Sequence, residues 1–386
     1  MNIIKKITPL IKTILSLIRI FLKIKSNKNK TIFFYFPVKA YYQNIIDISV
    51  QLRKNKKLNL FLIYNNSSQE ILKNNKNSYF LNINYLKLIP FSNFFLKNVN
   101  LFISSYVNYV FLPKAKNIYI CHDMTDSPMV NLSLEKKLFL SLGKLHYIFL
   151  SSSIVVEYFM RKFLQFDHNV NDVPALINTG YLKLDKVMKE LKEIKNIKSH
   201  ILLAPTFSGQ MKNYNMSSKL DIIIDNILLT GEKIIFRPHP LDLTSKGKIK
   251  DIQKIFEKYK NNSNFFFDNS HSYMDSYSKA KMLITDFSGT AYTFAYSTLR
   301  PVIFFSKNEN KFFETKIADL FFYQDRLSVG LICQNIKQLL KSIAKINKKK
   351  DYNKNKIFNL RKKRIKYVNK SLDQTIMQIL KICKKI

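Results

Sequence analysis

Short apolar runs alternate along the chain with longer segments of mixed polarity, and polar residues follow most of the runs. In the first half the runs lie at residues 31–37, 58–65, 99–105, 116–123 and 146–153. In the second half they lie at residues 200–207, 232–240, 262–269, 281–289 and 301–305. Buried strands that alternate with helices are typical of a mainly parallel sheet. The pattern predicts two α/β domains that meet near residues 190–199, with a ligand cleft at the carboxyl ends of their strands.

Residues 1–25 have the pattern of a basic amphipathic helix. Lys5, Lys12 and Arg19 recur every seven residues on one stripe, with Lys23 beside it. The expected apolar face consists of Ile7, Ile11, Ile14, Ile18 and Phe21. The basic residues leave no run of about 18 apolar residues, which argues against a membrane-spanning helix, and no small-residue cleavage site follows. Two interpretations stay open: the helix lies on a membrane surface, or it docks on the protein's own core.

The chain carries 64 Lys and Arg residues against 26 Asp and Glu residues, a formal net charge of +38. Such a charge attracts anionic lipid, nucleic acid or phosphorylated substrates. Lys, Asn and Ile are abundant together, as an A/T-rich genome produces, so part of the charge is expected to be solvated surface. No zinc-finger spacing or RNA-binding aromatic strand is present, and we expect no nucleic-acid partner. The three cysteines predict neither a disulfide framework nor a metal site.

Polar residues suited to chemistry follow four of the apolar runs directly. They are His122 and Asp123, Thr206 to Gly209, Arg237 and His239, and Asp286 to Thr290. Pro238 and Pro240 flank His239 and constrain its backbone. Loops at strand ends commonly carry function, and four such ends that converge on one cleft favour a functional site over coincidence.

Ser288, Gly289 and Thr290 can form the N-cap and first turn of the helix that follows. Free N–H groups and the positive end of the helix dipole bind phosphate there, and Gly289 allows an anion to approach the backbone. The alternative is that Ser288 only caps the helix. The donor-rich segment 204–215 is a candidate loop for closing over a ligand. The glycine-rich phosphate loop, the dinucleotide fingerprint, the serine-hydrolase elbow and the HExxH zinc motif are all absent.

Six segments of the sequence resemble one known family in their order and context. They are CHDMTDSP from residue 121, SSSIVVEYF from 151, TGYLKLD from 179, LLAPTFSG from 202, FRPHPLD from 236, and SYSKAKMLITDFSGTAYTFAYSTLRPVIFF from 276. This set resembles the CDP-glycerol glycerophosphotransferases, the teichoic-acid primases and polymerases with a GT-B fold. The resemblance covers roughly residues 100–310, and RPHP with ITDFSG is its most specific part.

The resemblance implies roles for individual residues. His122 matches the family's general base on the acceptor hydroxyl, and His239 matches the histidine that contacts the donor phosphates. Ser288 and Thr290 stand where the family binds pyrophosphate at a helix N-terminus. The complete donor-binding set that we expect is Thr206, Ser208, Arg237, Asp286, Ser288, Gly289 and Thr290. An alternative for Arg237 is a structural ion pair with a nearby acid.

Asp123 and Asp126 are expected to contact the acceptor or to support residues that do. Two carboxylates on a loop without a third suitably spaced ligand predict no metal site. The sequence also departs from the family pattern. Asp123 and Met124 replace the usual Gly-Thr, Cys121 replaces an aromatic residue, and Gly289 replaces the second serine. Because of these departures, the sequence leaves the identity of the donor undecided.

The expected fold is therefore GT-B-like, with two Rossmann-like α/β domains facing a central cleft. A membrane-associating helix and linker occupy residues 1–28, an acceptor-side domain 29–195, a donor-binding domain 196–345, and a basic helical tail 346–386. The expected activity transfers glycerol phosphate or a related phospho-alditol from a CDP-linked donor, without a cofactor, to a glycan or lipid-linked acceptor.

This activity would serve bacterial surface polysaccharide or teichoic-acid-like polymer synthesis, peripherally at the cytoplasmic face of the plasma membrane. Two alternatives stay open. One is a GT-B glycosyltransferase that uses a CMP- or UDP-sugar, as sialyl- and Kdo-transferases do. The other is a non-catalytic scaffold that binds anionic membrane surfaces through the excess positive charge.

Overall fold

A computed structural model of the chain describes residues 2–37, 42–65, 72, 75, 77–89, 92–106, 112–122, 124, 132–166, 172–195, 197–209, 212, 214–245, 247–270, 272–312, 320–349 and 351–386. The chain divides into two compact units, each with its own sheet. Unit 1 comprises Met1–His122, Asn131–Lys183 and Ile365–Ile386. Unit 2 comprises Asp123–Val130 and Leu184–Arg364.

Unit 1 contains a seven-stranded parallel sheet in the order β3-β2-β1-β4-β5-β6-β7. Its strands are β1 (Lys30–Phe36), β2 (Leu58–Tyr64), β3 (Ser78–Phe80), β4 (Val99–Ser104), β5 (Lys116–Ile120), β6 (Tyr147–Leu150) and β7 (Ala175–Asn178). Its helices are α1 (Asn2–Lys25), α2 (Tyr42–Leu52), η3 (Ile83–Leu88), α4 (Ser92–Phe95), α5 (Leu132–Leu142), α6 (Ser153–Gln165) and α18 (Ser371–Lys385).

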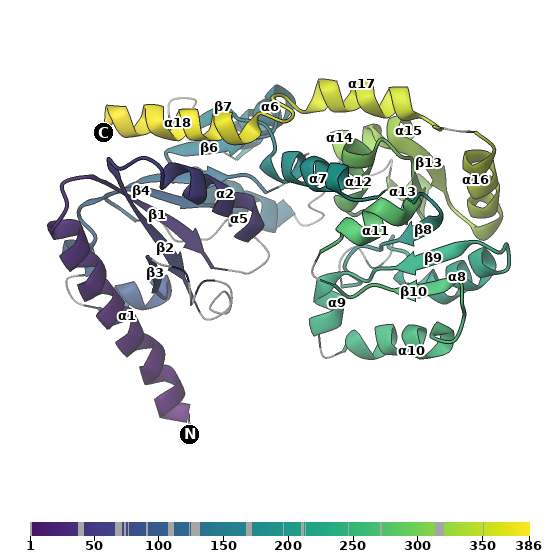
Figure 1. The fold of residues 1–386 in the computed structure, drawn as a ribbon, viewed down its shortest axis with the longest axis horizontal. Coiled ribbons are helices and arrows are strands. Elements are labelled where there is room, and N and C mark those ends of the chain that lie inside the picture. Colours follow the sequence, from purple (N-terminus) through teal and green to yellow (C-terminus); the bar gives the residue numbers. More distant parts are fainter. Residues whose placement is uncertain are drawn as a thin grey trace. The chain divides into compact units, whose positions relative to one another are not determined.

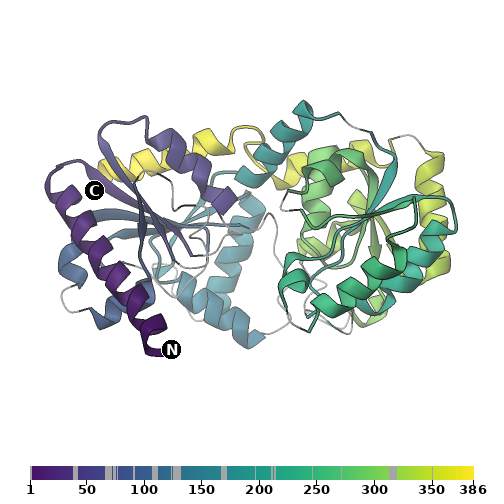
Figure 2. The same cartoon turned by 60° about the horizontal axis from the view of Figure 1, so that its bottom comes forward.

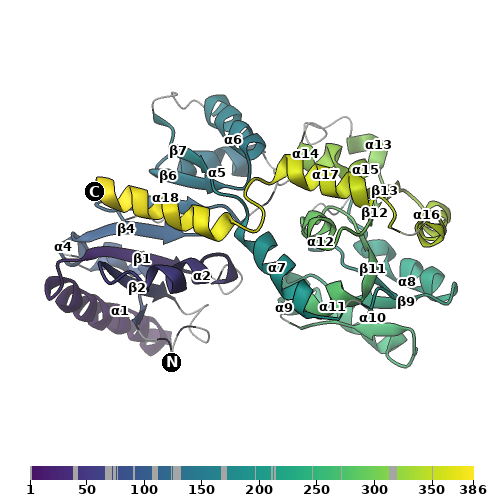
Figure 3. The same cartoon turned by 45° about the horizontal axis from the view of Figure 1, so that its top comes forward.

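Both faces of the unit 1 sheet are covered, which explains why its strands read as unbroken apolar runs. On β1, Ile32 and Phe34 pack into a core with residues of α2 and α18, and Figure 3 shows α18 in yellow along this sheet. Phe33 and Tyr35 point the other way and pack into a second core with α1, which Figure 2 shows in dark purple. The alternation follows from the two-residue period of a strand.

Unit 2 contains a six-stranded parallel sheet in the order β10-β9-β8-β11-β12-β13. Its strands are β8 (His200–Leu203), β9 (Lys233–Phe236), β10 (Phe265–Phe267), β11 (Ala280–Thr285), β12 (Val302–Phe305) and β13 (Gly330–Cys333). α7 (Leu182–Glu193) leads into it, followed by η5 (Ser217–Lys219), α8 (Leu220–Leu228), α9 (Pro240–Thr244), α10 (Ile249–Tyr259), α11 (Met274–Lys279), α12 (Thr290–Thr298), α13 (Glu309–Phe312), α14 (Phe321–Gln324), α15 (Arg326–Val329), α16 (Ile336–Lys348) and α17 (Lys354–Arg364).

The architecture confirms the prediction of two parallel α/β sheets, and in both the strand order reverses beside the first strand, as in Rossmann folds. The apolar runs predicted ten strands, and each run contains one. Three further strands were missed: β3, β7 and β13. They have only three or four residues each and lie at sheet edges, so they carry little periodic signal.

The last 41 residues do not form one separate tail. α17 belongs to unit 2, where Arg364 forms an ion pair with Asp325 at 2.6 Å and Arg361 donates to the Tyr296 carbonyl at 2.6 Å. α18 belongs to unit 1 and buries Ile379 and Ile382 in its core. The basic composition of residues 346–386 hides these anchors, because Arg361 and Arg364 look like surface charges in the sequence but are buried.

α1 presents one apolar face to the protein and another to solvent. Leu17, Ile20 and Ile24 are buried in the core of unit 1. Among the side chains of α1 that the structure describes, the exposed apolar ones are Ile11, Ile14, Leu15, Ile18 and Leu22. Ile7 of the expected apolar face lies outside the described side chains. Ile11, Ile14 and Ile18 of the expected apolar face are thus on the exposed side, while Phe21 contacts Phe94 and Phe95. Among the described residues, no helix combines the length and hydropathy needed to cross a bilayer.

Candidate functional site

Three adjacent strands of unit 2, β9, β8 and β11, end at one edge of the sheet, and their loops carry the donor-site candidates. Figure 1 labels β8 and β9, and Figure 3 labels β9 and β11. β8 lies between β9 and β11, with Leu203 opposite both Phe236 and Ile284. The strand order reverses between β8 and β11, and parallel sheets bind ligands at such a point. The structure places eight candidates on these loops: Thr206, Ser208, Arg237, His239, Asp286, Ser288, Gly289 and Thr290.

The side chain of Asp286 joins the loop after β11 to the loop after β8. Its Oδ1 accepts hydrogen bonds of 2.8 Å from the N–H groups of Thr206 and Phe287. Its Oδ2 accepts a hydrogen bond of 2.8 Å from the N–H of Met216. Asp286 is 1% exposed, and burial raises the pKa of its carboxyl, against the opposing effect of the N–H donors. The carboxylate thereby holds both ends of the loop after β8.

The side chain of Asp242 joins this loop to the turn after β9. Its carboxylate accepts hydrogen bonds from the Ser208 N–H at 3.1 Å and from the Ser208 hydroxyl at 2.5 Å. The Asp242 N–H donates to the His239 carbonyl at 2.8 Å. Asn215 Nδ2 donates to the Ser208 carbonyl at 3.1 Å. The hydroxyl proton of Ser208 is therefore directed at Asp242.

Gly209 allows the loop after β8 to fold tightly on itself. A Cβ atom at this position would lie 2.6 Å from the ring of Phe207. The ring of Phe207 in turn lies 5.8 Å from the ring of His239, measured between centroids. The absence of a side chain at residue 209 thus sets where Phe207 meets the histidine.

His239 caps the short helix α9, and Pro240 occupies the first turn. Its Nδ1 accepts a hydrogen bond from the Leu241 N–H at 3.2 Å. Burial lowers the pKa of His239, although the nearby Asp242 acts in the opposite direction. A neutral ring whose Nδ1 is an acceptor carries its proton on Nε2. The turn therefore holds one N–H donor of this imidazole for a ligand.

Arg237 makes the ion pair that the sequence left as an alternative. Its Nη1 lies 2.6 Å from Asp268 Oδ2, and both side chains are mostly buried. Nη2 donates to the Ser270 carbonyl at 2.8 Å, and Nη1 reaches the Ser272 carbonyl at 3.3 Å. The pKa of Asp268 is lowered by hydrogen bonds from Ser270 and Ser276 and by the charge of Arg237, against the effect of burial. Arg237 ties the turn after β9 to residues 268–272.

The N-terminus of α12 follows the loop after β11 and contains Ser288, Gly289 and Thr290. Gly289 is the N-cap, and the Ser288 hydroxyl accepts a hydrogen bond from the Thr290 N–H at 3.3 Å. The Thr290 hydroxyl lies 2.8 Å from the hydroxyl of Tyr277, which is buried. A Cβ atom on Gly289 would meet nothing within 4 Å, and its φ of −59° is open to any residue. No neighbour in the described part of the chain therefore requires a glycine here.

His122 lies in unit 1, after β5, and is half-buried. Its Nδ1 is 2.8 Å from the hydroxyl of Tyr119, and its carbonyl accepts a hydrogen bond of 2.7 Å from the hydroxyl of Tyr181. These contacts fix both the ring and the backbone of the histidine. The remaining acceptor-side candidates, Asp123 and Asp126, lie outside the described residues.

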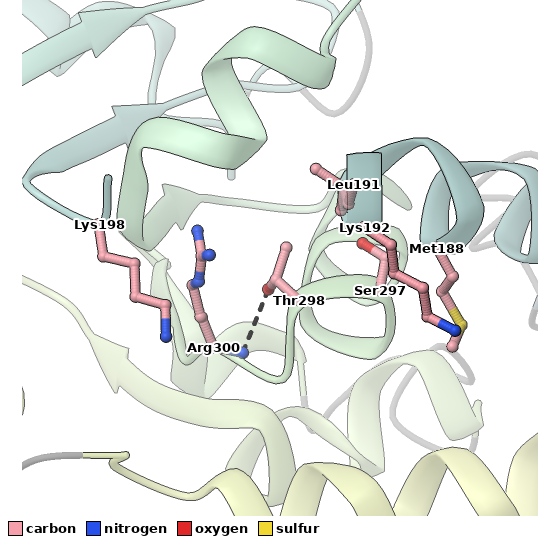
Figure 4. Close-up of a pocket in the computed structure, with 7 residues that line it drawn as sticks. All are labelled: Met188, Leu191, Lys192, Lys198, Ser297, Thr298 and Arg300. Carbon is pink, nitrogen blue, oxygen red and sulfur yellow. Dashed lines mark hydrogen bonds between the residues drawn. The ribbon is translucent and has the colours of Figure 1, made fainter. Parts of the chain in front are cut away.

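A cavity of about 270 Å³ lies elsewhere in unit 2 (Figure 4). Its lining residues are Met188, Leu191, Lys192, Lys198, Ser297, Thr298 and Arg300. Lys198 precedes β8 and Arg300 precedes β12, so this cavity is at the amino edge of the sheet, opposite the candidate site. Within the described residues, no three His, Cys, Asp or Glu side chains are grouped to hold a metal ion.

The structure adds residues that sequence reasoning did not single out. Asp242 ends the segment FRPHPLD, and its position three residues after the histidine, in the first turn of a helix, was an available signal. Tyr277 and Asp268 left no local signal, because each reaches its partner across the fold. Tyr119 precedes His122 by three residues in an apolar run, where an aromatic residue reads as core.

Comparisons with known proteins agree with this geometry. The family model for CDP-Glycerol:Poly(glycerophosphate) glycerophosphotransferase matches residues 16–381. The wall teichoic acid polymerase TagF is similar in structure, with a TM-score of 0.63, 16% identity, and coverage of 100% of this chain and 98% of TagF. UDP-GlcNAc 2-epimerase from Methanocaldococcus jannaschii has a TM-score of 0.58 at 17% identity, over 91% of this chain and 99% of the epimerase. No curated protein matches the chain in sequence.

Two parallel sheets with Rossmann strand order define a GT-B-like fold. The chain belongs to the CDP-glycerol:poly(glycerophosphate) glycerophosphotransferase family. The resemblance seen in the sequence motifs is thereby confirmed over nearly the whole chain.

Proposed function

We propose that the protein transfers glycerol phosphate, or a related phospho-alditol, from a CDP-linked donor to a hydroxyl of a glycan or lipid-linked acceptor. The observation that carries the proposal is the family match over residues 16–381, in a chain whose unit 2 gathers donors at one sheet edge. TagF, which shares the fold, has also been solved after soaking with CDPG.

Unit 2 supplies the contacts for the donor in this proposal. The N-terminus of α12, with the hydroxyls of Ser288 and Thr290, is suited to the pyrophosphate. His239 donates from Nε2 to a phosphate oxygen, because Nδ1 is engaged by the Leu241 N–H. Fixed donors of this kind stabilise charge that develops on the leaving phosphate without reorganising.

His122 is the base for the acceptor in this proposal. The acceptor oxygen bonds to the phosphorus that carries glycerol, the bond from that phosphorus to the bridging oxygen breaks, and CMP leaves with the electron pair. The acceptor proton passes to Nε2 of His122, which requires the ring's own proton on Nδ1, facing the Tyr119 hydroxyl. The Tyr119 hydroxyl oxygen can accept that proton in a hydrogen bond.

The experiment is product analysis with purified protein, a lipid-linked glycan acceptor and three donors: CDP-glycerol, CMP-sialic acid and UDP-GlcNAc. We expect CMP and a phosphodiester from CDP-glycerol. A glycoside formed from either nucleotide sugar would replace the proposal with a glycosyltransferase. Calorimetry with the same donors detects binding without turnover, and a protein that binds none of them would be a scaffold.

The proposal includes a place at the surface of an anionic membrane. The exposed side of α1 carries Ile11, Leu15, Ile18 and Leu22, spaced by four, three and four residues, which puts them on one helical face. The buried residues Leu17, Ile20 and Ile24 hold the opposite face on the protein. Lys12, Arg19 and Lys23 lie between the two faces. Such a helix rests on a lipid surface while staying part of the domain.

Vesicle sedimentation tests this part of the proposal. The full-length protein should sediment with phosphatidylglycerol vesicles and much less with phosphatidylcholine vesicles. The double variant Leu15→Gln/Leu22→Gln should lose binding to the anionic vesicles by at least about tenfold, because two apolar side chains no longer enter the lipid. Leu229→Gln, a matched change at an apolar residue that is 85% exposed in unit 2, should bind as the wild type does. If the double variant and Leu229→Gln bind anionic vesicles equally well, α1 does not contact the membrane.

A further inference from the structure

We propose that Asp242 and Asp286 are positioning residues that join the three loops of the donor site into one preformed frame without touching the donor. The loops follow β8, β9 and β11. Asp286 links the loop after β11 to the loop after β8, and Asp242 links that loop to the turn after β9. The inference rests on the proposed function, because it assigns these loops to the donor.

Both carboxylate oxygens of Asp286 are already engaged by the backbone. Its carboxylate accepts three backbone N–H groups at 2.8 Å, from residues 206, 216 and 287. The residue is 1% exposed, so its oxygen atoms face the interior. An ionised carboxylate also repels a phosphate. The arrangement fits a group that shapes the loop from behind and leaves the anion to other donors.

Two of these contacts, those of Thr206 and Met216, are ten residues apart in the chain. Thr206 and Met216 are the two ends of the loop after β8, and both N–H groups bind the same carboxylate. The adjacent Thr285 hydroxyl donates to the Ala204 carbonyl at 2.6 Å, which holds the start of the loop a second time. Thr285, the last residue of β11, and Asp286, which follows it, therefore hold the two ends of this loop together.

Asp242 extends the frame to the histidine. It is 2% exposed and accepts both the N–H and the hydroxyl of Ser208, while its own N–H donates to the His239 carbonyl. Phe207 precedes Ser208, and its ring packs beside His239. Any shift of Ser208 consequently moves Phe207 against the imidazole that we assign to the donor phosphate.

Replacing either carboxylate by an amide changes the frame at a defined atom. Asp286→Asn keeps one acceptor oxygen but sets an NH2 group against a backbone N–H of the loop. Asp242→Asn does the same at the Ser208 N–H, and Ser208→Ala removes only the hydroxyl contact. Asp251→Asn is the matched control, because Asp251 is an exposed aspartate in the first turn of α10.

The test measures CDP-glycerol affinity by calorimetry and KM for donor and acceptor in the full-length protein. Displacing positioned groups by about 1 Å costs as much as 100-fold. We expect Asp242→Asn to weaken CDP-glycerol binding and raise the donor KM by about 10- to 100-fold, with the acceptor KM unchanged. Ser208→Ala should have a smaller effect in the same direction, and Asp251→Asn none.

Hydrogen exchange of peptides that cover residues 204–216 supplies a readout of the frame itself. Asp286→Asn should expose these amides to faster exchange while peptides from β12 keep their protection. Asp286→Asn is a substitution in the core and can cause misfolding. If this variant does not fold, the donor affinity and KM of Asp242→Asn and Ser208→Ala test the inference without it.

The inference is overturned if folded Asp242→Asn and Ser208→Ala bind CDP-glycerol as the wild type does. It is also overturned if the donor KM and the acceptor KM rise together, which a general loss of structure would cause. A wild-type protein that binds no CDP-glycerol overturns the proposed function instead, and the two failures are thereby distinguished.

Discussion

The two sheets share a strand order but differ in what lies at the reversal point. In unit 2 the loops that follow β8 and β11 carry Thr206, Asp286 and Ser288, and a histidine follows the neighbouring β9. In unit 1 the corresponding strand β4 ends at Ser104, which is followed by Ser105, and both serines are buried. The Ser104 hydroxyl there contacts the carbonyls of Tyr35 and Tyr106. The two units therefore share the strand order, but the described residues at their reversal points differ in side chain.

The difference extends to ionisable groups. At the edge of the unit 2 sheet, burial lowers the pKa of His239 and raises the pKa of Asp286, and hydrogen bonds help to lower the pKa of Asp268. Perturbed groups that cluster in this way mark functional sites more often than chance. In unit 1, His146 also has a pKa lowered by burial, but it lies at the amino edge of its sheet, just before β6. We therefore expect similar substitutions to have different effects on activity or stability, depending on where in the molecule they are made.

The largest contrast is expected between two histidines that make the same local contact. His239 and His146 each use Nδ1 to accept a backbone N–H at 3.2 Å, from Leu241 and Asn117 respectively. His239→Ala should reduce turnover by about 10²- to 10³-fold, because a donor to the phosphate is lost. His146→Ala should leave turnover within about twofold, because it loses only a cap-like contact. Comparable losses of kcat in both variants would contradict the expected difference between the two histidines.

A second contrast concerns ion pairs within unit 2. Arg237→Gln leaves the mostly buried Asp268 without its partner and should lower the free energy of unfolding by about 3 kcal/mol. Lys258→Gln removes a pair whose side chains are 47% and 46% exposed, and should cost less than about 1 kcal/mol. Chemical denaturation of the two variants measures both. A cost for Arg237→Gln below that of Lys258→Gln would show that its pair does not hold the turn after β9.

A third contrast uses two glycines of the same site. Gly209→Ala places a Cβ against the Phe207 ring, and we expect several-fold weaker CDP-glycerol binding with a lower Tm. Gly289→Ala adds a Cβ to open space, so the Tm should not fall. A loss of donor affinity in Gly289→Ala at unchanged Tm would locate the phosphate at the α12 N-terminus. Unchanged affinity would place it elsewhere on this edge.

The smallest effect is the dependence of stability on pH. Burial is the first cause that lowers the pKa of His146 in unit 1 and of His200 and His239 in unit 2. The unfolded chain therefore takes up protons near pH 6.5, before the folded chain does. The free energy of unfolding should fall as the pH is lowered from 7.5 to 6.0, and denaturant titrations at both values measure it. A stability that rises over this interval would contradict the lowered pKa values.

Much of the fold and part of the site could be predicted from the sequence. Apolar runs locate ten of the described strands, because buried parallel strands leave continuous hydrophobic stretches. His239, Ser288 and Thr290 stand out because each follows such a run and belongs to a recognisable motif. The orientation of α1 could not be predicted, since apolar residues occupy both of its faces and periodicity alone does not say which one is buried.

The sequence by itself determined the succession of strands, the polar residues at their ends and the family to which they belong, because these depend on local pattern. Only the tertiary structure decided which carboxylate meets which loop. Asp286 and Met216 are 70 residues apart in the chain, and Ser208 and Asp242 are 34 apart. Such contacts form because β8, β9 and β11 become neighbours in the sheet, and strand adjacency is a property of the folded chain.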